Sequence, residues 1–203
     1  MALIDYGRKK IYLNVKDGKI ERPFKNSEGA WERTTHSAIE GYVVDVEVQE
    51  KEDYTKRKYK ELQLHILDDE YYVLCCRAFK PFSDGLLASL ANTDLSKPHR
   101  ISPYKGNARE AGITPPTYCS VKMKGNDESV RWIDGIPEIQ YEDGGDGTTT
   151  PLRGERNKFF LNIIEEIHSN TKENREKLLK PQSAPLTETP VEEEDDYSEG
   201  SLE

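Results

Sequence analysis

Residues 37–49 alternate between two sets of side chains, and this alternation constrains the fold more than any other stretch. The even positions from Tyr42 to Val48 are apolar, and most positions between them are polar. A period of two over this length predicts a β-strand. Gly41 lies inside the strand, where a glycine usually marks a bulge or bend that lets a sheet curl. We therefore expect a mainly β protein whose sheet curls around this strand.

Two further strands follow this first one. Residues 61–66 alternate in the same way, Asp68-Asp69 predicts a turn, and residues 71–79 predict the third strand. The connection at residues 50–60 is basic in its second half and carries two tyrosines. A curled antiparallel sheet with such a first loop is typical of an OB-fold, a five-stranded Greek-key barrel that binds oligonucleotides.

A hairpin is predicted before the barrel. Residues 11–16 and 19–22 are strand-like, and the Asp-Gly pair at 17–18 favours a tight turn because both residues can adopt positive φ. Residues 23–35 predict a loop. The whole unit 1–35 is expected to pack on the barrel.

The chain after the third strand predicts the remainder of a barrel domain that spans residues 36–140. Apolar residues at helical spacing predict a short helix over 83–90, with Ser83 as its N-cap, between the third and fourth strands. The fourth strand is predicted at residues 99–102, and Pro98 and Pro103 on its two sides confine it to the edge of a sheet or to the ends of a strand. The later strands are predicted at residues 99–102, 118–124 and 129–133.

The C-terminal part divides into a linker, a helix and a tail. Residues 141–150 have linker composition, and residues 151–180 predict a helix with a broad apolar face from Phe159 to Ile167. That face needs a partner, either the barrel of the same chain or a second subunit of a homo-oligomer. Residues 181–203 hold eight of the acids in a chain of net charge −9 and no Lys or Arg, so they predict a disordered acidic tail on a nearly neutral body.

No pattern in the sequence predicts catalysis. There is no Ser-His-Asp pattern, phosphate-binding glycine loop or H-E-x-x-H motif. The three cysteines have neither C-x-x-C spacing nor a histidine at zinc spacing. We therefore expect a protein that is not an enzyme and that holds no metal or cofactor. Reduced cysteines, the lack of an apolar leader and the lack of a membrane-spanning run predict a soluble, cytoplasmic protein.

Aromatic residues interleaved with basic residues indicate a surface for single-stranded nucleic acid. Such strands are held by a positive groove along the backbone and by rings on which bases stack, at roughly 1–3 kcal/mol per base. The densest cluster is the first loop with the start of the second strand, although a merely solvated hairpin is an equally simple interpretation. The predicted binding residues are Tyr54, Lys56, Arg57, Lys58, Tyr59, Lys60, Arg77, Phe79, Lys80, Lys97, Arg100, Tyr104, Lys105, Lys122 and Lys124.

The order of these features resembles that of bacteriophage-type single-stranded DNA-binding proteins. The resemblance covers residues 36–140 and the tail. It rests on the basic aromatic loop, the PFSDGLLASL helix, the DLSKP segment and the acidic end. It implies an OB-fold that coats single-stranded DNA during replication, recombination or repair in the host cytoplasm. It also implies a tail that recruits partner proteins and competes with DNA. The implied tail residues are Glu192, Glu193, Glu194, Asp195, Asp196, Tyr197 and Leu202.

A second interpretation remains open on the sequence alone. The barrel could serve as a scaffold for protein interaction or assembly, with the C-terminal helix and the tail as its active parts and no nucleic acid bound. Binding of RNA instead of DNA is a variant of the first interpretation.

Overall fold

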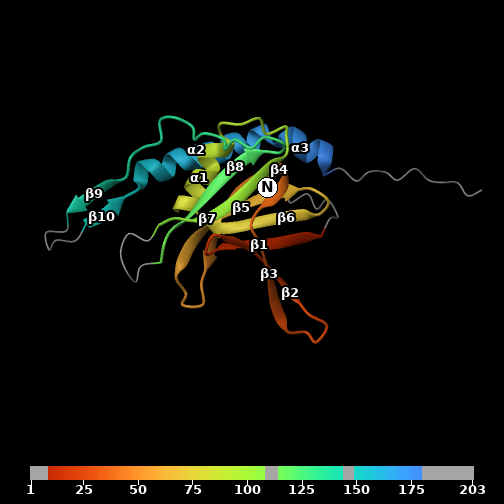
Figure 1. The fold of residues 1–203 in the computed structure, drawn as a ribbon. Coiled ribbons are helices and arrows are strands. Elements are labelled where there is room, and N and C mark those ends of the chain that lie inside the picture. Colours follow the sequence, from red (N-terminus) through yellow and green to blue (C-terminus); the bar gives the residue numbers. More distant parts are fainter. Residues whose placement is uncertain (1–8, 108–113, 144–148, 180–203) are drawn as a thin grey trace, which may run out of the picture.

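The protein is built on one curled sheet, in a computed structural model that describes residues 9–107, 114–143 and 149–179 (Figure 1). The sheet has eight strands in the order β3-β2-β1-β6-β5-β4-β7-β8, so the prediction of a mainly β fold is confirmed. A closed five-stranded barrel is not confirmed, because the sheet is open and three N-terminal strands extend one of its edges. The eight strands are β1 (Lys10–Lys16), β2 (Lys19–Lys25), β3 (Trp31–His36), β4 (Ile39–Glu52), β5 (Lys58–Leu67), β6 (Tyr71–Arg77), β7 (His99–Lys105) and β8 (Thr117–Met123).

The long strand β4 bends so that it serves both halves of the sheet. Its start pairs with β7, where Gly41 lies opposite His99, and from Tyr42 onward it pairs with β5. Gly41 has φ 152°, and a Cβ there would come within 2.6 Å of Ile66 Cγ2. Only glycine fits this conformation and this space, so the predicted bend at Gly41 is confirmed.

A bulge in β4 changes which side chains face the core. The pairing with β5 shifts between Val43 and Asp45, which leaves Val44 as the extra residue. Val43 and Val46 therefore both face the main core, whereas Val44 joins a smaller cluster with Leu179. The prediction of one uninterrupted even-numbered face is wrong for this reason.

The N-terminal segment forms three strands instead of a hairpin and a loop. β1 and β2 form the predicted hairpin, and β1 pairs in parallel with β6. The predicted loop at 23–35 is wrong, because β2 and β3 form a second hairpin with six residue pairs from Ile20–His36 to Lys25–Trp31. The pairing of β2 with β1 ends at Glu21, so Pro23 has a neighbouring strand, β3, on one side only. A proline is tolerated in a strand at such an edge position.

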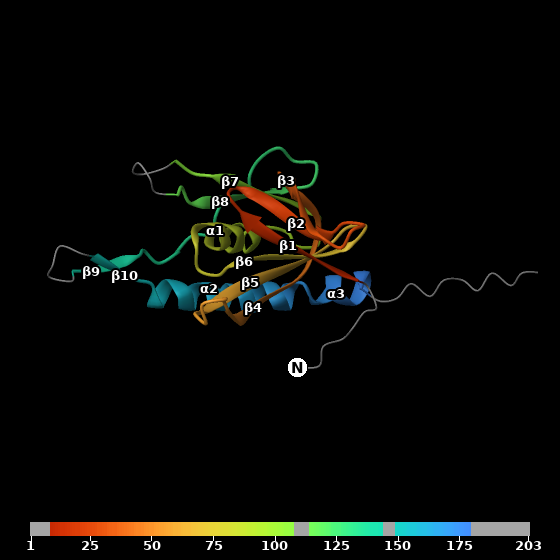
Figure 2. The same cartoon turned by 90° about the horizontal axis from the view of Figure 1, so that it is seen from below.

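The short helix α1 (Pro81–Leu90) lies between β6 and β7 in the chain, as predicted. It begins two residues earlier than expected, with Lys80 and not Ser83 as the N-cap; the Lys80 N–H donates to Ser83 Oγ at 2.9 Å. Figure 2 shows α1 between the β7–β8 pair and α2. Nearly every α1 side chain is buried there, so this helix fills the centre of the core.

Two further predictions fail downstream of β8. Residues 129–133 do not form a strand, because their pairing with β8 is limited to the isolated Lys122–Ser129 bridge. The predicted linker contains the strands β9 (Gln140–Asp143) and β10 (Thr149–Leu152), which pair as a separate hairpin. The residues between them, 144–148, lie outside the described part of the chain.

Helix α2 (Gly154–Asn170) and the short helix α3 (Lys172–Leu178) lie along the free edge of β4. Phe160, Ile163 and Ile167 of α2 are buried in the core that α1 also fills. The apolar face predicted for this helix therefore packs within its own chain. The helix begins three residues later than expected, since β10 continues to Leu152.

No helix in the described ranges is long and apolar enough to cross a membrane. The acidic tail predicted at 181–203 lies outside the described residues.

Candidate nucleic-acid interface

A groove lies where the β4–β5 hairpin meets the corner between β6 and α1. Its volume is about 410 Å³. Six of the sequence-predicted residues line it, together with Glu50 and Ala78. The six are Lys58, Tyr59, Lys60, Arg77, Phe79 and Lys80.

The β4–β5 hairpin ends in a tightly bonded turn. The Asp53 carboxylate accepts hydrogen bonds from the Thr55 and Arg57 backbone N–H groups at 2.8 and 3.0 Å, and Lys56 adopts φ 61°. The Thr55 hydroxyl, which donates to the same carboxylate at 2.6 Å, is the main cause that lowers the pKa of Asp53. Tyr54 is 99% exposed on this turn and does not line the groove. Of the binding residues predicted in this loop and at the start of the next strand, the groove contains only Lys58, Tyr59 and Lys60.

Side chains from β5 and β6 form the wall of the groove. The Arg77 guanidinium lies over the Tyr59 ring, 4.7 Å from its centre. Phe79 lies beyond the end of β6 at φ 58°, so the third strand ends two residues earlier than the predicted range 71–79. Arg153 donates a hydrogen bond of 3.1 Å to the Phe79 carbonyl, which fixes this strained corner.

The cations of the groove have no carboxylate at ion-pair distance among the described residues. This holds for Lys58, Lys60, Arg77 and Lys80, and their side chains are exposed. Glu50, Glu52 and Glu61 lie opposite Lys60, Lys58 and Arg77 across the strand pairs, without reaching ion-pair distance. The four cations outnumber Glu50, the one carboxylate among the described residues that line the groove, and this net positive charge attracts a polyanion. An aromatic ring among them adds a surface on which a base can stack.

Most of the other predicted cations are paired. Lys97 lies 3.5 Å from Asp94, and Lys105 lies 3.8 Å from Asp17. The Glu40 carboxylate forms ion pairs with both Arg100, at 3.4 Å, and Lys124, at 3.8 Å. A cation already held by a carboxylate has less charge to offer a phosphate.

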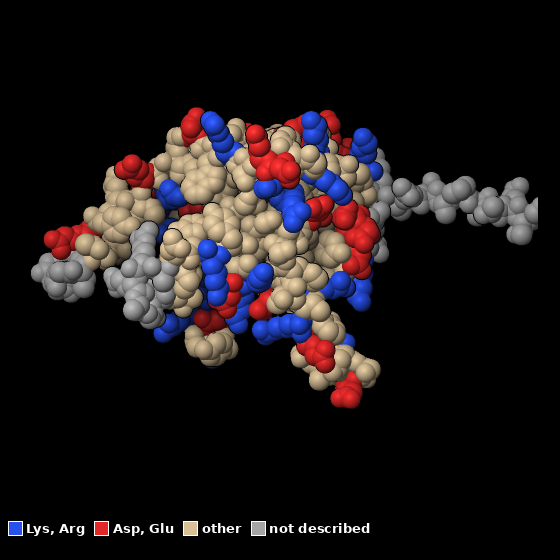
Figure 3. Space-filling model, in the orientation of Figure 1, with Lys and Arg blue, Asp and Glu red and all other residues tan. Residues whose placement is uncertain are grey.

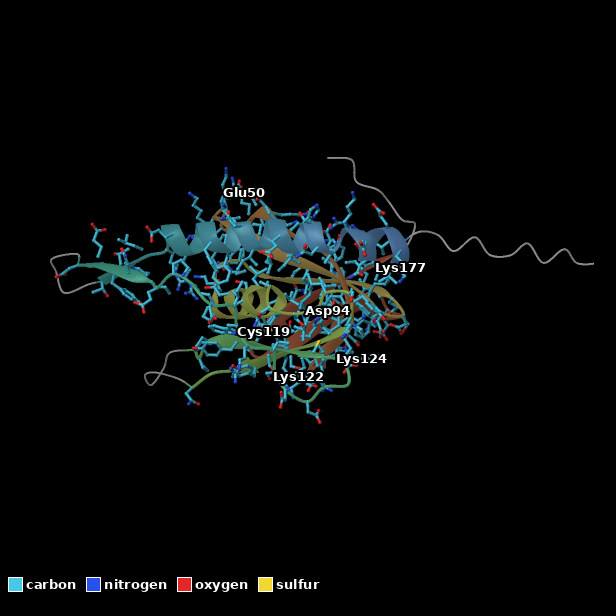
Figure 4. The ribbon with its side chains drawn as sticks, turned by 90° about the horizontal axis from the view of Figure 1, so that it is seen from above. Glu50, Asp94, Cys119, Lys122, Lys124 and Lys177 are labelled. Carbon is cyan, nitrogen blue, oxygen red and sulfur yellow. The ribbon has the colours of Figure 1, made fainter. Side chains whose placement is uncertain are left out.

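The structure separates the predicted residues into two surfaces. Arg100 pairs with Lys122, and Tyr104 with Tyr118, on β7 and β8. The two tyrosine rings also stack at 5.8 Å. Figure 4 shows Lys122 and Lys124 on the opposite side of the molecule from Glu50, which lines the groove, with α1 between them. The sequence prediction had treated these surfaces as one.

The N-terminal hairpin carries further cations near the end of β6, and its turn contacts the end of β7, where a Cβ at Gly18 would lie 2.7 Å from Lys105 N. β1 lies against β6 in register, with Asn14 beside Cys75, so Lys16 and Arg77 each follow two residues later. Lys19 lies opposite Lys16 across the β1–β2 turn, and both lysines are exposed. Sequence reasoning recognised this hairpin but missed these lysines, because the parallel pairing of β1 with β6 joins residues distant in the chain.

Farther along β5 and β6, the face that carries Tyr59 and Arg77 holds a polar network. His65 lies 2.9 Å from the Tyr71 hydroxyl and 3.2 Å from Glu47 Oε1. The hydrogen bond from His65 is the largest cause that holds the pKa of Glu47 below its usual value, and burial opposes it. This network supports the sheet.

The cysteines are not candidates for reactive thiols. Burial raises the pKa of Cys75 to about 12, and it raises the pKa values of Cys76 and Cys119 well above the ordinary value. A thiol that stays protonated is a poor nucleophile and a poor metal ligand. In the ranges 9–107, 114–143 and 149–179, no group of three or more His, Cys, Asp or Glu side chains is placed to hold a metal ion.

The fold and groove together define a mainly β protein with a curled open sheet and a basic, aromatic groove at one corner. Comparisons with protein-family models, with curated proteins and with solved structures gave no match. Its function is therefore argued from the site.

Proposed function

We propose that this protein binds single-stranded DNA with little sequence preference and acts without catalysis. The observation that carries the proposal is a groove lined by four cations and Tyr59, with the Arg77 guanidinium over the Tyr59 ring and with Glu50 as the one carboxylate among its described residues. Lys and Arg side chains neutralise phosphates whatever the sequence, and stacking on a ring is possible for every base. By coating exposed strands, the protein would protect them during replication, recombination or repair.

The strand order supports an OB-fold within the larger sheet. Five neighbouring strands of the sheet, in the order β6-β5-β4-β7-β8, have the long bent strand β4 in the middle. In the chain these strands follow one another as β4, β5, β6, β7 and β8, and α1 lies between β6 and β7. OB-folds bind oligonucleotides on the face of their second and third strands and on the loop between the first and second. The groove residues come from the corresponding elements, β5, β6 and the β4–β5 hairpin.

A role in protein assembly is the second candidate, and the β9–β10 hairpin favours it. This hairpin projects from the body in Figure 1, and its Tyr141 and Leu152 are 62% and 47% exposed. Exposed apolar side chains on a projecting hairpin suit a protein partner. Recruitment of replication or recombination proteins through the acidic tail is compatible with either candidate.

Fluorescence anisotropy with a labelled thymidine oligomer tests the proposal. At low salt we expect tight binding, and log Kd should rise linearly with log salt because counterions are released from the strand. A variant with Lys58, Lys60 and Lys80 all changed to Ala should lose most of this binding. The matched control changes Lys97, Arg100 and Lys124, which have carboxylate partners, to Ala. Equal losses in both triple variants, or no binding by the unmodified protein, would refute the proposed groove.

A further inference from the structure

The β2–β3 hairpin projects away from the body of the molecule (Figure 1). Every residue of β3 is exposed, from Trp31 to His36. Figure 3 shows Lys, Arg, Asp and Glu side chains together along this lower edge, where the hairpin leaves the body. No β3 side chain belongs to the hydrophobic core, so core packing does not explain why this hairpin is present.

The hairpin is stiff up to its tip. Asn26 Oδ1 accepts the backbone N–H groups of Glu28 and Ala30 at 3.0 and 2.9 Å, and Asn26 Nδ2 donates to Glu32 at 2.7 Å. Trp31 begins the returning strand and is 70% exposed. Its ring is therefore presented to solvent by an ordered frame, and a ligand would lose little free energy in ordering it.

One face of the hairpin continues the outer face of the main sheet. A row of partners runs from Gln63 on β5 through Cys75, Asn14 and Glu21 to Thr35 on β3. Partners in such a row point to the same side, and each step of two residues along a strand stays on that side. The residues that share the face with this row on β1, β2 and β3 include Lys16, Lys19, Lys25, Trp31 and Arg33.

This strip is mainly basic. Lys16, Lys19 and Lys25 have no carboxylate at ion-pair distance among the described residues, and Glu21 is held by Arg33 at 3.4 Å. The Lys25 ammonium lies 5.3 Å from the centre of the Trp31 ring. Cations beside an exposed ring are the combination that holds a single strand, by phosphate contact and by stacking.

We propose that the β2–β3 hairpin is a second contact for the same single strand that occupies the groove, an inference that rests on the proposed function. Trp31 stacks on a base, and Lys25 contacts a neighbouring phosphate. The strand passes from the groove over Lys16 and Lys19 to the hairpin. Lys19 and Lys25 are roughly 20 Å apart along β2 at 3.3 Å per residue. Only oligomers long enough to span this distance reach Trp31.

Tryptophan fluorescence with thymidine oligomers of increasing length tests this inference. The protein carries two tryptophans, and Trp132 packs against α1 at Gly85, so Trp132→Phe leaves Trp31 as the only tryptophan, which can be excited selectively over the tyrosines. We expect short oligomers to bind without changing the emission of Trp31, and longer ones to quench it. The converse variant, Trp31→Phe, should lose this length-dependent quenching.

Affinities measured by anisotropy give the second readout. Trp31→Ala should weaken the Kd for long oligomers roughly 5- to 100-fold, the loss of one stacked base, and leave short oligomers unaffected. Trp31→Phe should retain most of the affinity. Tyr141→Ala, an exposed aromatic on the separate β9–β10 hairpin, is the matched control and should bind as the unmodified protein does.

The outcomes distinguish the two proposals. If the unmodified protein binds no oligomer, the proposed function fails and this inference fails with it. If it binds, but Trp31 is not quenched and Trp31→Ala binds long oligomers normally, only the hairpin contact is refuted. A change in Trp31 emission with protein concentration in the absence of DNA, without quenching by DNA, would assign the hairpin to a second copy of the chain and would also refute it.

Discussion

Tyr59 and Arg77 show how one residue pair can combine the two interactions that a single strand needs. The guanidinium lies 4.7 Å from the ring centre, on the wall of the groove. The arginine holds the ring in place from one side, while its own charge remains available to a phosphate. Tyr104, predicted on equal terms from the sequence, instead stacks with Tyr118 at 5.8 Å on the β7–β8 pair.

This difference leads to a first prediction. Tyr59→Ala should weaken thymidine-oligomer binding by about 1–3 kcal/mol, because one stacking surface is lost. Lys58→Ala should lower the slope of log Kd against log salt by roughly 0.7, the value for one phosphate of a single strand. Anisotropy titrations over a range of salt measure both effects. Tyr104→Ala and Lys97→Ala are the matched controls, and effects as large in them would show that the groove is not the binding site.

A second prediction concerns Glu47 and pH. The His65 hydrogen bond lowers the pKa of Glu47 below its ordinary value of 4.5. A lowered pKa in the folded state gives stability that is present above pH 4.5 and lost as the pH falls through the lowered pKa. The difference in unfolding free energy between the unmodified protein and Glu47→Gln should therefore shrink on acidification from pH 6 to pH 3. Urea denaturation across this range measures it, and a difference independent of pH would contradict the assignment.

At the scale of elements, the bend in β4 creates a free strand edge that the C-terminal helices cover. Asn174 of α3 is 9% exposed and donates from Nδ2 to the Val43 carbonyl at 2.9 Å and to the Leu95 carbonyl at 2.7 Å. On the same edge, the Asp45 carboxylate accepts hydrogen bonds from the His168 ring at 2.7 Å and from the Arg175 guanidinium at 2.8 Å. These contacts hold α2 and α3 against the sheet, so the helices belong to the same folding unit.

A third prediction follows for the stability of this unit. Asn174→Ala leaves two buried carbonyls without their donor and should lower the unfolding free energy by about 1–3 kcal/mol. Chemical denaturation followed by circular dichroism measures the change. Asn170→Ala, an exposed position at the end of α2, should change it by no more than roughly 0.5 kcal/mol. An Asn174→Ala variant as stable as this control would mean that α3 does not hold the edge of β4.

At the scale of the whole molecule, charge is divided between body and tail. Eight acids in residues 181–203 account for most of the net charge of −9. A polyanion tethered to a protein with a basic groove has an effective concentration there in the millimolar range if the tether is flexible. We therefore expect such a segment to compete with the strand that the groove would bind.

A fourth prediction tests this competition. Deleting residues 181–203 should tighten oligomer binding at low salt, and the gain should disappear at high salt, since the interaction is screened within about 10 Å at 0.1 M. A matched variant keeps the length of the tail but changes Glu192, Glu193, Glu194, Asp195 and Asp196 to their amides. Anisotropy should show the same tightening in both variants. Unchanged affinity at every salt concentration would leave the tail as a solubilising segment only.

Local patterns were enough to predict the central strands, the β1–β2 hairpin, α1 and α2. Strand alternation, the Asp-Gly turn and helical spacing are properties of neighbouring residues, so they are visible in the sequence. The β2–β3 hairpin was missed because Glu32 to His36 are polar on both faces and show no alternation. The bulge at Val44 was missed because its cause is the packing of Val44 against Leu179, far away in the chain.

For the candidate site, the sequence by itself determined the residue types and one cluster, Lys58, Tyr59 and Lys60, because these residues are close in the chain. Only the tertiary structure decided which distant cations join them. The parallel pairing of β1 with β6 brings Asn14 beside Cys75, two residues before Lys16 and Arg77, and ion pairs with Glu40 and Asp94 hold Arg100, Lys124 and Lys97 elsewhere. Composition lists the charges of a chain, but the spatial arrangement of the strands decides which charges are neutralised and which remain free to bind.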